Sequence, residues 1–187
     1  IGYGGGVFMS KKISRNLEEN LKEIRSLFEN CYDIIIREIE VGEVLNVKMS
    51  FVYIDGLIDK NFLSEYAIAS IIQEEELKSF TEQGYRTTVL EAVLKEGLAT
   101  SEVSLEEDFN KAIDLILSGD TVLFIENADQ GIVIGTRFFP TRSIEEPKIE
   151  TVIRGPRDGF TETLKINTSL VRKRIKDTRF KIEVENV

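Results

Sequence analysis

Residues 146–176 read EPKIETVIRGPRDGFTETLKINTSLVRKRIK, and this stretch decides how the second half of the chain folds. Its centre, RGPRDG at residues 154–159, predicts a tight turn, because proline fixes φ and glycine permits positive φ. A helix is predicted directly afterwards, over residues 161–176. The last turns of this helix carry four cationic side chains: Arg172, Lys173, Arg174 and Lys176.

The chain carries its positive charge unevenly. The net charge is −9 over 187 residues, but residues 151–179 hold eight Lys and Arg against three acidic residues, so the remainder is strongly acidic. Such a basic strip argues against a general nucleic-acid binder, which would be basic over a whole face. It predicts docking to something locally anionic: a carboxylate or phosphate ligand, lipid head groups, or the acidic part of the same protein.

Composition excludes several classes of function. The absence of histidine removes the usual general base and the histidine-containing metal sites, so we expect no enzyme, no metal and no cofactor. The single cysteine, Cys31, excludes an internal disulfide framework. No stretch of 18 apolar residues is present, so we expect no membrane span within this sequence.

Hydrophobic periodicity predicts an interleaved α/β unit over residues 11–139. Helices are predicted over residues 14–30, 61–76 and 88–96, and antiparallel strands over 33–40 and 44–54. Three consecutive isoleucines, residues 34–36, suggest that the first strand is buried on both faces. The sequence SLEE at 104–107 resembles a capping box, which predicts a helix from Leu105 to Gly119. A hairpin of strands 121–126 and 132–137 completes the unit.

Over residues 140–187 we expect a linker and the start of a second unit. This unit contains the helix at 161–176 and a strand at 180–184. One helix and one strand cannot bury their apolar faces alone. We therefore expect an α/β fold of two small α/β subdomains with mixed sheets, the second incomplete in this chain. Residues 1–10, IGYGGGVFMS, predict a flexible leader or a cloning remnant.

The stretch at 146–176 closely resembles the signature of the GerA family, the A subunits of spore germinant receptors. The shared positions are Glu146-Pro147, Glu150, Arg154-Gly155-Pro156-Arg157, Gly159-Phe160-Thr161-Glu162, Leu164, Asn167, Leu170, Arg172, Arg174 and Ile175. Asp158, Thr163 and Lys173 are conservative departures from that pattern. The resemblance extends upstream through CYDI at 31–34, YIDGL at 53–57 and SGDTVL at 118–123.

This resemblance implies a soluble N-terminal domain of a membrane-bound A subunit, in an assembly with B and C subunits in the spore inner membrane. It implies a role in sensing or relaying a small nutrient signal, with membrane attachment through segments absent from this chain. Self-association is a further partner hypothesis. The alternative is an oligomerisation or interaction module that binds no nutrient itself.

Two groups of residues in the stretch 146–176 are candidate sites. Arg154 and Arg157, at a helix N-terminus, could bind an anionic ligand, or could pair with acidic neighbours to fix the junction of the two subdomains. These neighbours are Glu146, Glu150 and Glu162. Asn167 is expected on the buried stripe of the helix, where its amide would tie a loop or face a ligand cleft.

Two further candidates rest on charge. Arg172, Lys173, Arg174 and Lys176 could contact a partner subunit or anionic lipid, or could simply form the solvated end of a helix. Asp55, at the end of a predicted strand, could bind a cation or a ligand's ammonium group, although Asp-Gly turn chemistry explains it equally well.

Overall fold

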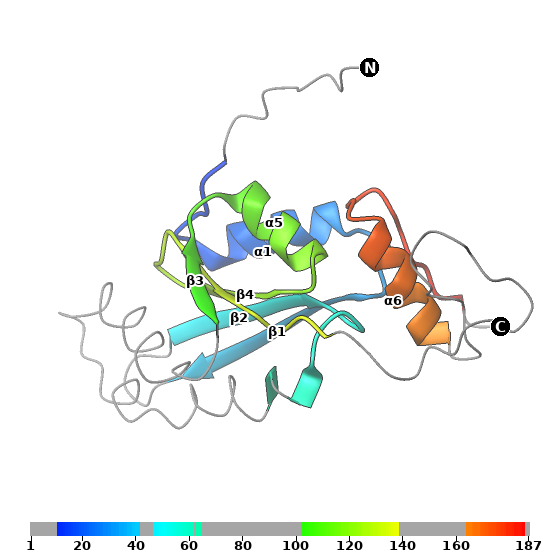
Figure 1. Ribbon diagram of the computed structural model, residues 1–187. Coiled ribbons are helices and arrows are strands. Elements are labelled where there is room, and N and C mark those ends of the chain that lie inside the picture. Colours follow the sequence, from blue (N-terminus) through cyan, green and yellow to red (C-terminus); the bar gives the residue numbers. More distant parts are fainter. Residues whose placement is uncertain (1–10, 42–46, 62, 65–101, 139–163, 186–187) are drawn as a thin grey trace, which may run out of the picture.

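The computed structural model describes residues 11–41, 47–61, 63–64, 102–138 and 164–185. Two helices and five strands form one layered unit, and a last helix lies at one end of the sheet (Figure 1). The elements are α1 (Leu17–Leu27), β1 (Ile34–Val41), β2 (Val47–Ile54), β3 (Val103–Glu106), α5 (Phe109–Leu117), β4 (Thr121–Ile125), β5 (Gly131–Ile134) and α6 (Leu164–Arg174).

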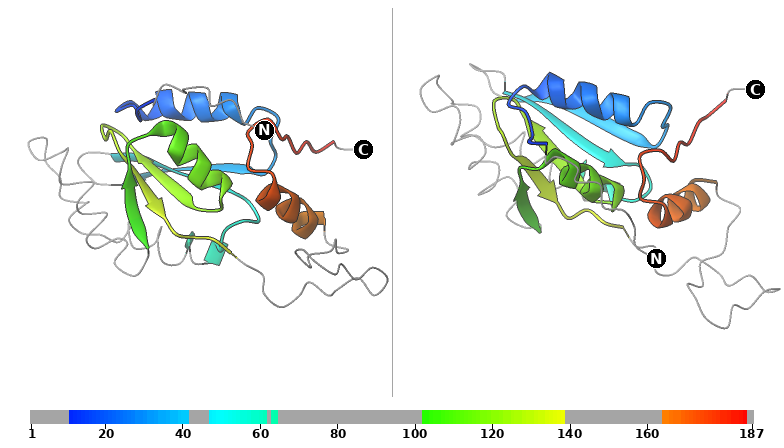
Figure 2. Two further views of the ribbon diagram at one scale, coloured as in Figure 1. Left: turned by 45° about the horizontal axis from the view of Figure 1, so that its top comes forward. Right: turned by 90° about the horizontal axis from the view of Figure 1, so that it is seen from above.

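The five strands form one sheet in the order β1-β2-β4-β5-β3. Every pairing is antiparallel, including the predicted β1–β2 pair, whose register runs from Ile34↔Ile54 to Val41↔Val47. The predicted α/β class is therefore confirmed, whereas the described sheet is antiparallel and not mixed. Helices α1 and α5 lie side by side on one face of this sheet (Figure 2).

Apolar side chains pack on both faces of the central strands. On the helix-covered face, Leu21 and Ile24 of α1 pack with Phe109 and Ile116 of α5 over Phe124 of β4. On the opposite face, strands β2, β4 and β5 contribute a second fully buried cluster that includes Met49, Phe51, Leu123, Ile132 and Ile134. The middle of the sheet is thus a two-sided core, which is the principal source of its stability.

The edge strand β1 differs from its prediction. Its three isoleucines are half-buried, and Arg37, Glu38 and Glu40 are exposed. The prediction of burial on both faces is wrong because β1 is the outermost strand of the described sheet. The run of isoleucines reflects a strand that is covered only in part.

The predicted first helix is confirmed, with tighter limits than residues 14–30. Asn16 is its N-cap, and its side-chain oxygen accepts a hydrogen bond from the Glu19 backbone N–H at 3.1 Å. The residues Leu17, Leu21 and Ile24 recur every three or four positions and are all buried. The sequence therefore fixes both the start of α1 and the face that it buries.

The capping box predicted at residues 104–107 is wrong. Residues 103–106 form β3, which pairs with β5 through Leu105↔Ile132. The helix begins at Phe109 with Asp108 as its N-cap, whose carboxylate accepts from the Lys111 N–H at 3.1 Å. Asp108, four residues after Ser104, is the N-cap that forms. Phe109, the first residue of this helix, packs against Phe124. The helix end at Gly119 is confirmed by its φ of +97°.

The strand predicted at residues 180–184 is not formed. One backbone hydrogen bond ties this segment to the sheet, from the Tyr32 N–H to the Ile182 carbonyl at 2.7 Å. The Phe180 carbonyl instead accepts from Arg172, and Lys181 donates to the Leu27 carbonyl at the end of α1. Most of the helix predicted at 61–76, the helix predicted at 88–96 and the boundary at residue 139 lie outside the described residues.

Candidate functional site

One face of α6 and of the residues just after it carries a stripe of three cations, Lys165, Arg172 and Lys176. Ser169 lies on the same face. The spacing of four, three and four residues between these four side chains places them in line along a helix and its C-terminal extension. Helix α6 lies at the end of the sheet where β1 begins and β2 ends, as Figure 2 shows from above. Lys165 and Arg172 of this stripe pair there with Asp55 and Asp33. Only Leu170 and Arg172 of α6 are buried, so charged and polar contacts dominate this junction.

Arg172 is the centre of the junction. Its Nε donates to Asp33 Oδ2 at 2.7 Å, and its Nη2 donates to Asp33 Oδ1 at 2.8 Å, which is a bidentate ion pair. The Arg172 side chain is 0% exposed and the Asp33 side chain 10% exposed. Nη1 donates to the Phe180 carbonyl at 2.8 Å, and the guanidinium lies 4.7 Å from the centre of the Phe180 ring.

This placement corrects the surface role expected of Arg172. A side chain that is fully buried and saturated by Asp33 and Phe180 does not face a partner subunit or lipid. Of the three anionic targets that the sequence left open for the basic strip, the described residues show the acidic part of the same protein. The pair joins α6 to residue 33, 139 positions earlier in the chain.

A second group of ion pairs is centred on Asp55, at the end of β2, the strand that neighbours β1. The Asp55 carboxylate contacts the ammonium groups of Lys60 at 2.7 Å and Lys165 at 3.0 Å. Burial acts to raise the pKa of Asp55, but hydrogen bonds from Lys60 and Lys165 outweigh it, and the pKa lies below its ordinary value. The Asp55 N–H donates to the Asp33 carbonyl at 2.7 Å, so the two acidic residues are directly connected through the backbone.

Asp55 therefore binds ammonium groups, and both belong to this chain. The adjoining Gly56 has a φ of +91°, and a Cβ built on it would lie 2.2 Å from Ser169 Oγ. The backbone of the β2 turn thus approaches α6 more closely than any side chain would allow. Gly56 is a condition for the docking of α6.

The other candidates are less closely engaged with this junction. Lys176 donates to Ser118 Oγ at 3.1 Å, which links the end of α6 to the end of α5. Lys173 and Arg174 are exposed, and Asn167 is half-buried and not buried as predicted. Arg154, Arg157, Glu146, Glu150 and Glu162 lie outside the described residues.

Sequence reasoning missed Asp33, Lys60, Lys165 and Phe180. Lys165 and Arg172 stand seven residues apart on one helical face, and Asp33 and Asp55 adjoin the paired residues Ile34 and Ile54 at the open end of one hairpin. Two cations two helical turns apart are spaced by about 10 Å, which is about twice the spacing of neighbouring strands. Sequence alone gives no reason to bring these pairs together.

Replacing Asp55 by Asn should lower the free energy of unfolding by about 1 kcal/mol at neutral pH, because the two partly exposed lysines lose their counter-charge. A folded-state pKa below the ordinary 3.8 stabilises the fold above that pH, and this contribution is lost as pH falls through the lowered pKa. Urea unfolding at neutral pH and at successively lower pH below 3.8 measures it. Asp114→Asn, at an exposed position of α5, is the matched control, and an equal loss in both variants would contradict the assignment.

No helix in the described part of the chain is both long and apolar enough to cross a membrane. The described residues also contain no group of three or more cysteine or acidic side chains placed to hold a metal ion. The site is therefore characterised by its ion pairs, which fix one helix against a sheet.

Comparison with known proteins establishes the family. Residues 22–187 match the family model of the Bacillus/Clostridium GerA spore germination protein, and the chain belongs to this family. The resemblance inferred from the sequence is confirmed.

Two curated relatives show how much of such proteins the chain represents. It is 32% identical to spore germination protein KA of Bacillus subtilis (strain 168), covering 95% of this chain and 30% of that protein. It is 31% identical to spore germination protein GerLA of Bacillus cereus, covering 92% of this chain and 33% of that protein. The chain therefore spans about a third of the length of these relatives.

A solved structure supports the fold. The N-terminal domain of the A subunit of the Bacillus megaterium spore germinant receptor GerK3 superposes with a TM-score of 0.68 and 22% sequence identity. The match covers 91% of this chain and 58% of that chain. The architecture described above is thus that of a germinant receptor A-subunit domain.

Proposed function

We propose that this chain serves in spore germination as the N-terminal domain of a membrane-bound germinant receptor A subunit, and that it relays a nutrient signal through α6. Family membership and the GerK3 fold support the receptor part of this proposal. The relay part rests on one observation: α6 is fixed to the sheet by the buried Arg172–Asp33 pair. No catalytic activity is part of the proposal.

The composition of the junction favours relay over direct capture of a nutrient there. Between α6 and the sheet end, Asp33 and Asp55 are already bound by Arg172, Lys165 and Lys60. A ligand with its own charged groups would have to displace these contacts, and an uncompensated buried charge costs about 3–5 kcal/mol. A junction made of ion pairs can couple a movement of α6 to a movement of the sheet.

The position of α6 in the chain suits it to this role. It follows residues 146–162, which carry the GPR-containing family stretch, and it ends in the segment that returns to Tyr32 and Leu27. If α6 shifts, there are two alternatives. The start of β1 and the end of β2 move with it, or the Arg172–Asp33 pair breaks. The junction between α6 and the sheet can therefore be either paired or broken, and a conformational switch requires two such states.

The expected partners follow from the receptor assignment. We propose assembly with B and C subunits in the spore inner membrane, with membrane attachment through parts of the receptor outside this chain. The relative YfkQ of Bacillus subtilis (strain 168), 35% identical over 172 residues, carries the description uncharacterized membrane protein, which supports membrane association. The exposed Lys173 and Arg174 remain candidates for a contact with a partner or with anionic lipid.

A reversible cross-link between α6 and the sheet tests the relay. In the receptor that carries this chain, Gly56→Cys with Ser169→Cys would place the two Cβ atoms about 3.4 Å apart, close to disulfide geometry. Because a side chain at Gly56 strains the backbone by itself, the oxidised double variant is compared with the same variant reduced by dithiothreitol, and the oxidised spores should respond to germinants much more slowly than the reduced ones. The two single-cysteine variants are the matched controls.

Two results would overturn this proposal. A normal germinant response with the cross-link fully formed would show that α6 does not move relative to the sheet during signalling. Saturable binding of an amino acid, sugar or nucleoside to the 187-residue chain, seen by NMR with shifts centred on Asp33 and Asp55, would assign the junction to direct capture.

A further inference from the structure

The edge of the sheet at β1 offers backbone groups for pairing. β1 is eight residues long and is hydrogen-bonded to β2 on one side, and within the described ranges no other strand pairs with it. The outer side of such a strand presents a row of N–H and C=O groups to any extended chain that approaches. The other edge strand, β3, has only four residues.

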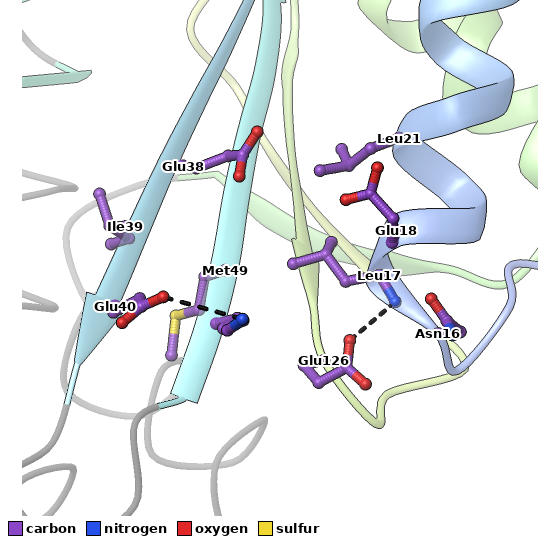
Figure 3. A pocket seen from close by; sticks show the side chains of 10 residues that line it. Asn16, Leu17, Glu18, Leu21, Glu38, Ile39, Glu40, Met49 and Glu126 are labelled. Carbon is purple, nitrogen blue, oxygen red and sulfur yellow. Dashed lines mark hydrogen bonds and ion pairs between the residues drawn. The ribbon is translucent and has the colours of Figure 1, made fainter.

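A groove of about 550 Å³ runs beside this edge, between the first half of α1 and the adjoining ends of β1 and β2 (Figure 3). It exists because α1 packs over β2 and β4, and in the part of the chain that the structure describes no other helix lies above the second half of β1. The apolar side chains of its lining are Leu17 and Leu21 of α1, because Ile39 and Met49 belong to the cluster on the opposite face of the sheet. Figure 3 shows Glu38 and Glu18 reaching toward the groove from β1 and α1.

The groove is acidic. Four carboxylates line it, from Glu18, Glu38, Glu40 and Glu126, against the single ammonium of Lys48. Glu18 and Glu38 share the one guanidinium of Arg25 at 2.9 and 2.7 Å, and Lys48 lies 3.9 Å from Glu40. Glu126 is held by the Leu17 backbone N–H. The lining therefore keeps an excess of negative charge that its own cations do not neutralise.

A buried hydroxyl lies beneath the same place. Ser50 is 0% exposed, and its Oγ has no hydrogen-bond partner in the described structure. Its register partner Glu38 and its chain neighbours Lys48 and Met49 all line the groove. Ser50 itself does not line the groove, so its hydroxyl is a cost of about 1–3 kcal/mol inside the sheet and not a contact for a bound peptide.

We propose that β1 and this groove form a docking surface for an extended basic peptide segment of a partner protein, which adds to the sheet as a further strand. Backbone hydrogen bonds to the outer edge of β1 would supply affinity. Alternate side chains of an added strand point to one face, so every second residue of the segment would enter the groove. The carboxylates select Lys or Arg at those positions, and the apolar lining accepts their methylene stems.

The charges on β1 argue against a second copy of this chain as the occupant. In an antiparallel pairing of two β1 strands about a two-fold axis, the groove-facing glutamates, Glu38 and Glu40, of both copies would lie on the same face. Like charges opposed across strands are destabilising. The same glutamates favour a strand of opposite charge.

The proposal is tested by titrating the 187-residue chain with a capped heptapeptide of alternating Lys and Val, followed by amide NMR. The strongest shifts are expected along β1, and a Glu/Val peptide of the same length should not bind. A Lys/Val peptide that is N-methylated at alternate residues should bind much more weakly, because it lacks the donors that pair with a strand edge.

Matched variants separate the groove from general electrostatics. Glu38→Gln with Glu40→Gln should weaken binding of the Lys/Val peptide by about tenfold, as two charge contacts are lost. Glu183→Gln with Glu185→Gln changes the net charge equally at exposed positions outside the groove and should leave binding unchanged. Equal weakening by both pairs, equal binding of the N-methylated peptide, or no binding at all would overturn the proposal.

Discussion

Replacing Arg172 with Ala is expected to lower the free energy of unfolding by about 3–5 kcal/mol, because it leaves the carboxylate of Asp33 buried without its counter-charge. The Phe180 carbonyl loses its donor in the same step, and the Phe180 ring loses the guanidinium. Urea denaturation of the 187-residue chain followed by circular dichroism measures the change. A lost Tyr32–Ile182 contact should appear as faster exchange of the Tyr32 amide.

Two companion variants identify the cause. Arg179→Ala removes an exposed arginine that pairs with Asp177, and it should leave the free energy of unfolding almost unchanged. Adding Asp33→Asn to Arg172→Ala should restore part of the lost stability, since a neutral amide needs no counter-charge. A loss of similar size for Arg172→Ala and Arg179→Ala would show that the pair does not hold α6 in place.

Replacing Gly56 with Ala is expected to destabilise the chain by about 2–5 kcal/mol through two separate effects. A φ of +91° strains a residue that has a Cβ, at about 1–2 kcal/mol. The new methyl group would also lie 2.2 Å from Ser169 Oγ, and such overpacking costs about 1–3 kcal/mol unless the hydroxyl rotates away. Thermal unfolding monitored by circular dichroism gives the combined effect.

The second substitution Ser169→Ala separates these effects. It deletes the clashing oxygen, and the next atom, Ser169 Cβ, lies at an ordinary 3.4 Å. Gly56→Ala with Ser169→Ala should therefore be more stable than Gly56→Ala alone, while it retains the backbone strain. Failure of Ser169→Ala to restore any stability would place the whole cost in the backbone and would show that Gly56 does not set the approach of α6.

Local chemistry explains which parts of the fold were predictable. The Leu17–Leu21–Ile24 spacing of α1 and the Gly119 stop of α5 are each encoded within a single helix and its end, and both were predicted. The capping box at residues 104–107 failed because two caps competed within five residues. The choice between them depended on Leu105 pairing with Ile132, 27 positions away.

The site was less predictable, because its contacts also join residues that are far apart in the chain. The sequence showed that the helix after the GPR turn is basic, and the family resemblance marked Arg172. It did not show that Arg172 would be the most deeply buried cation of this helix, because its partner Asp33 lies in a different element. The sequence marked Asp55 as a candidate for a cation or a ligand's ammonium group, and its partners in the structure are Lys60 and Lys165 of the same chain.

The separation between Arg172 and Asp33 also governs the order in which the protein assembles. During synthesis, α1, β1 and β2 leave the ribosome long before α6 exists, so Asp33 stays hydrated until its arginine is made. Lys181, which donates to the last turn of α1 at Leu27, is made later still. Contacts between such distant residues form slowly. The sheet should therefore fold first, and docking of α6 should be a late, separate step of folding.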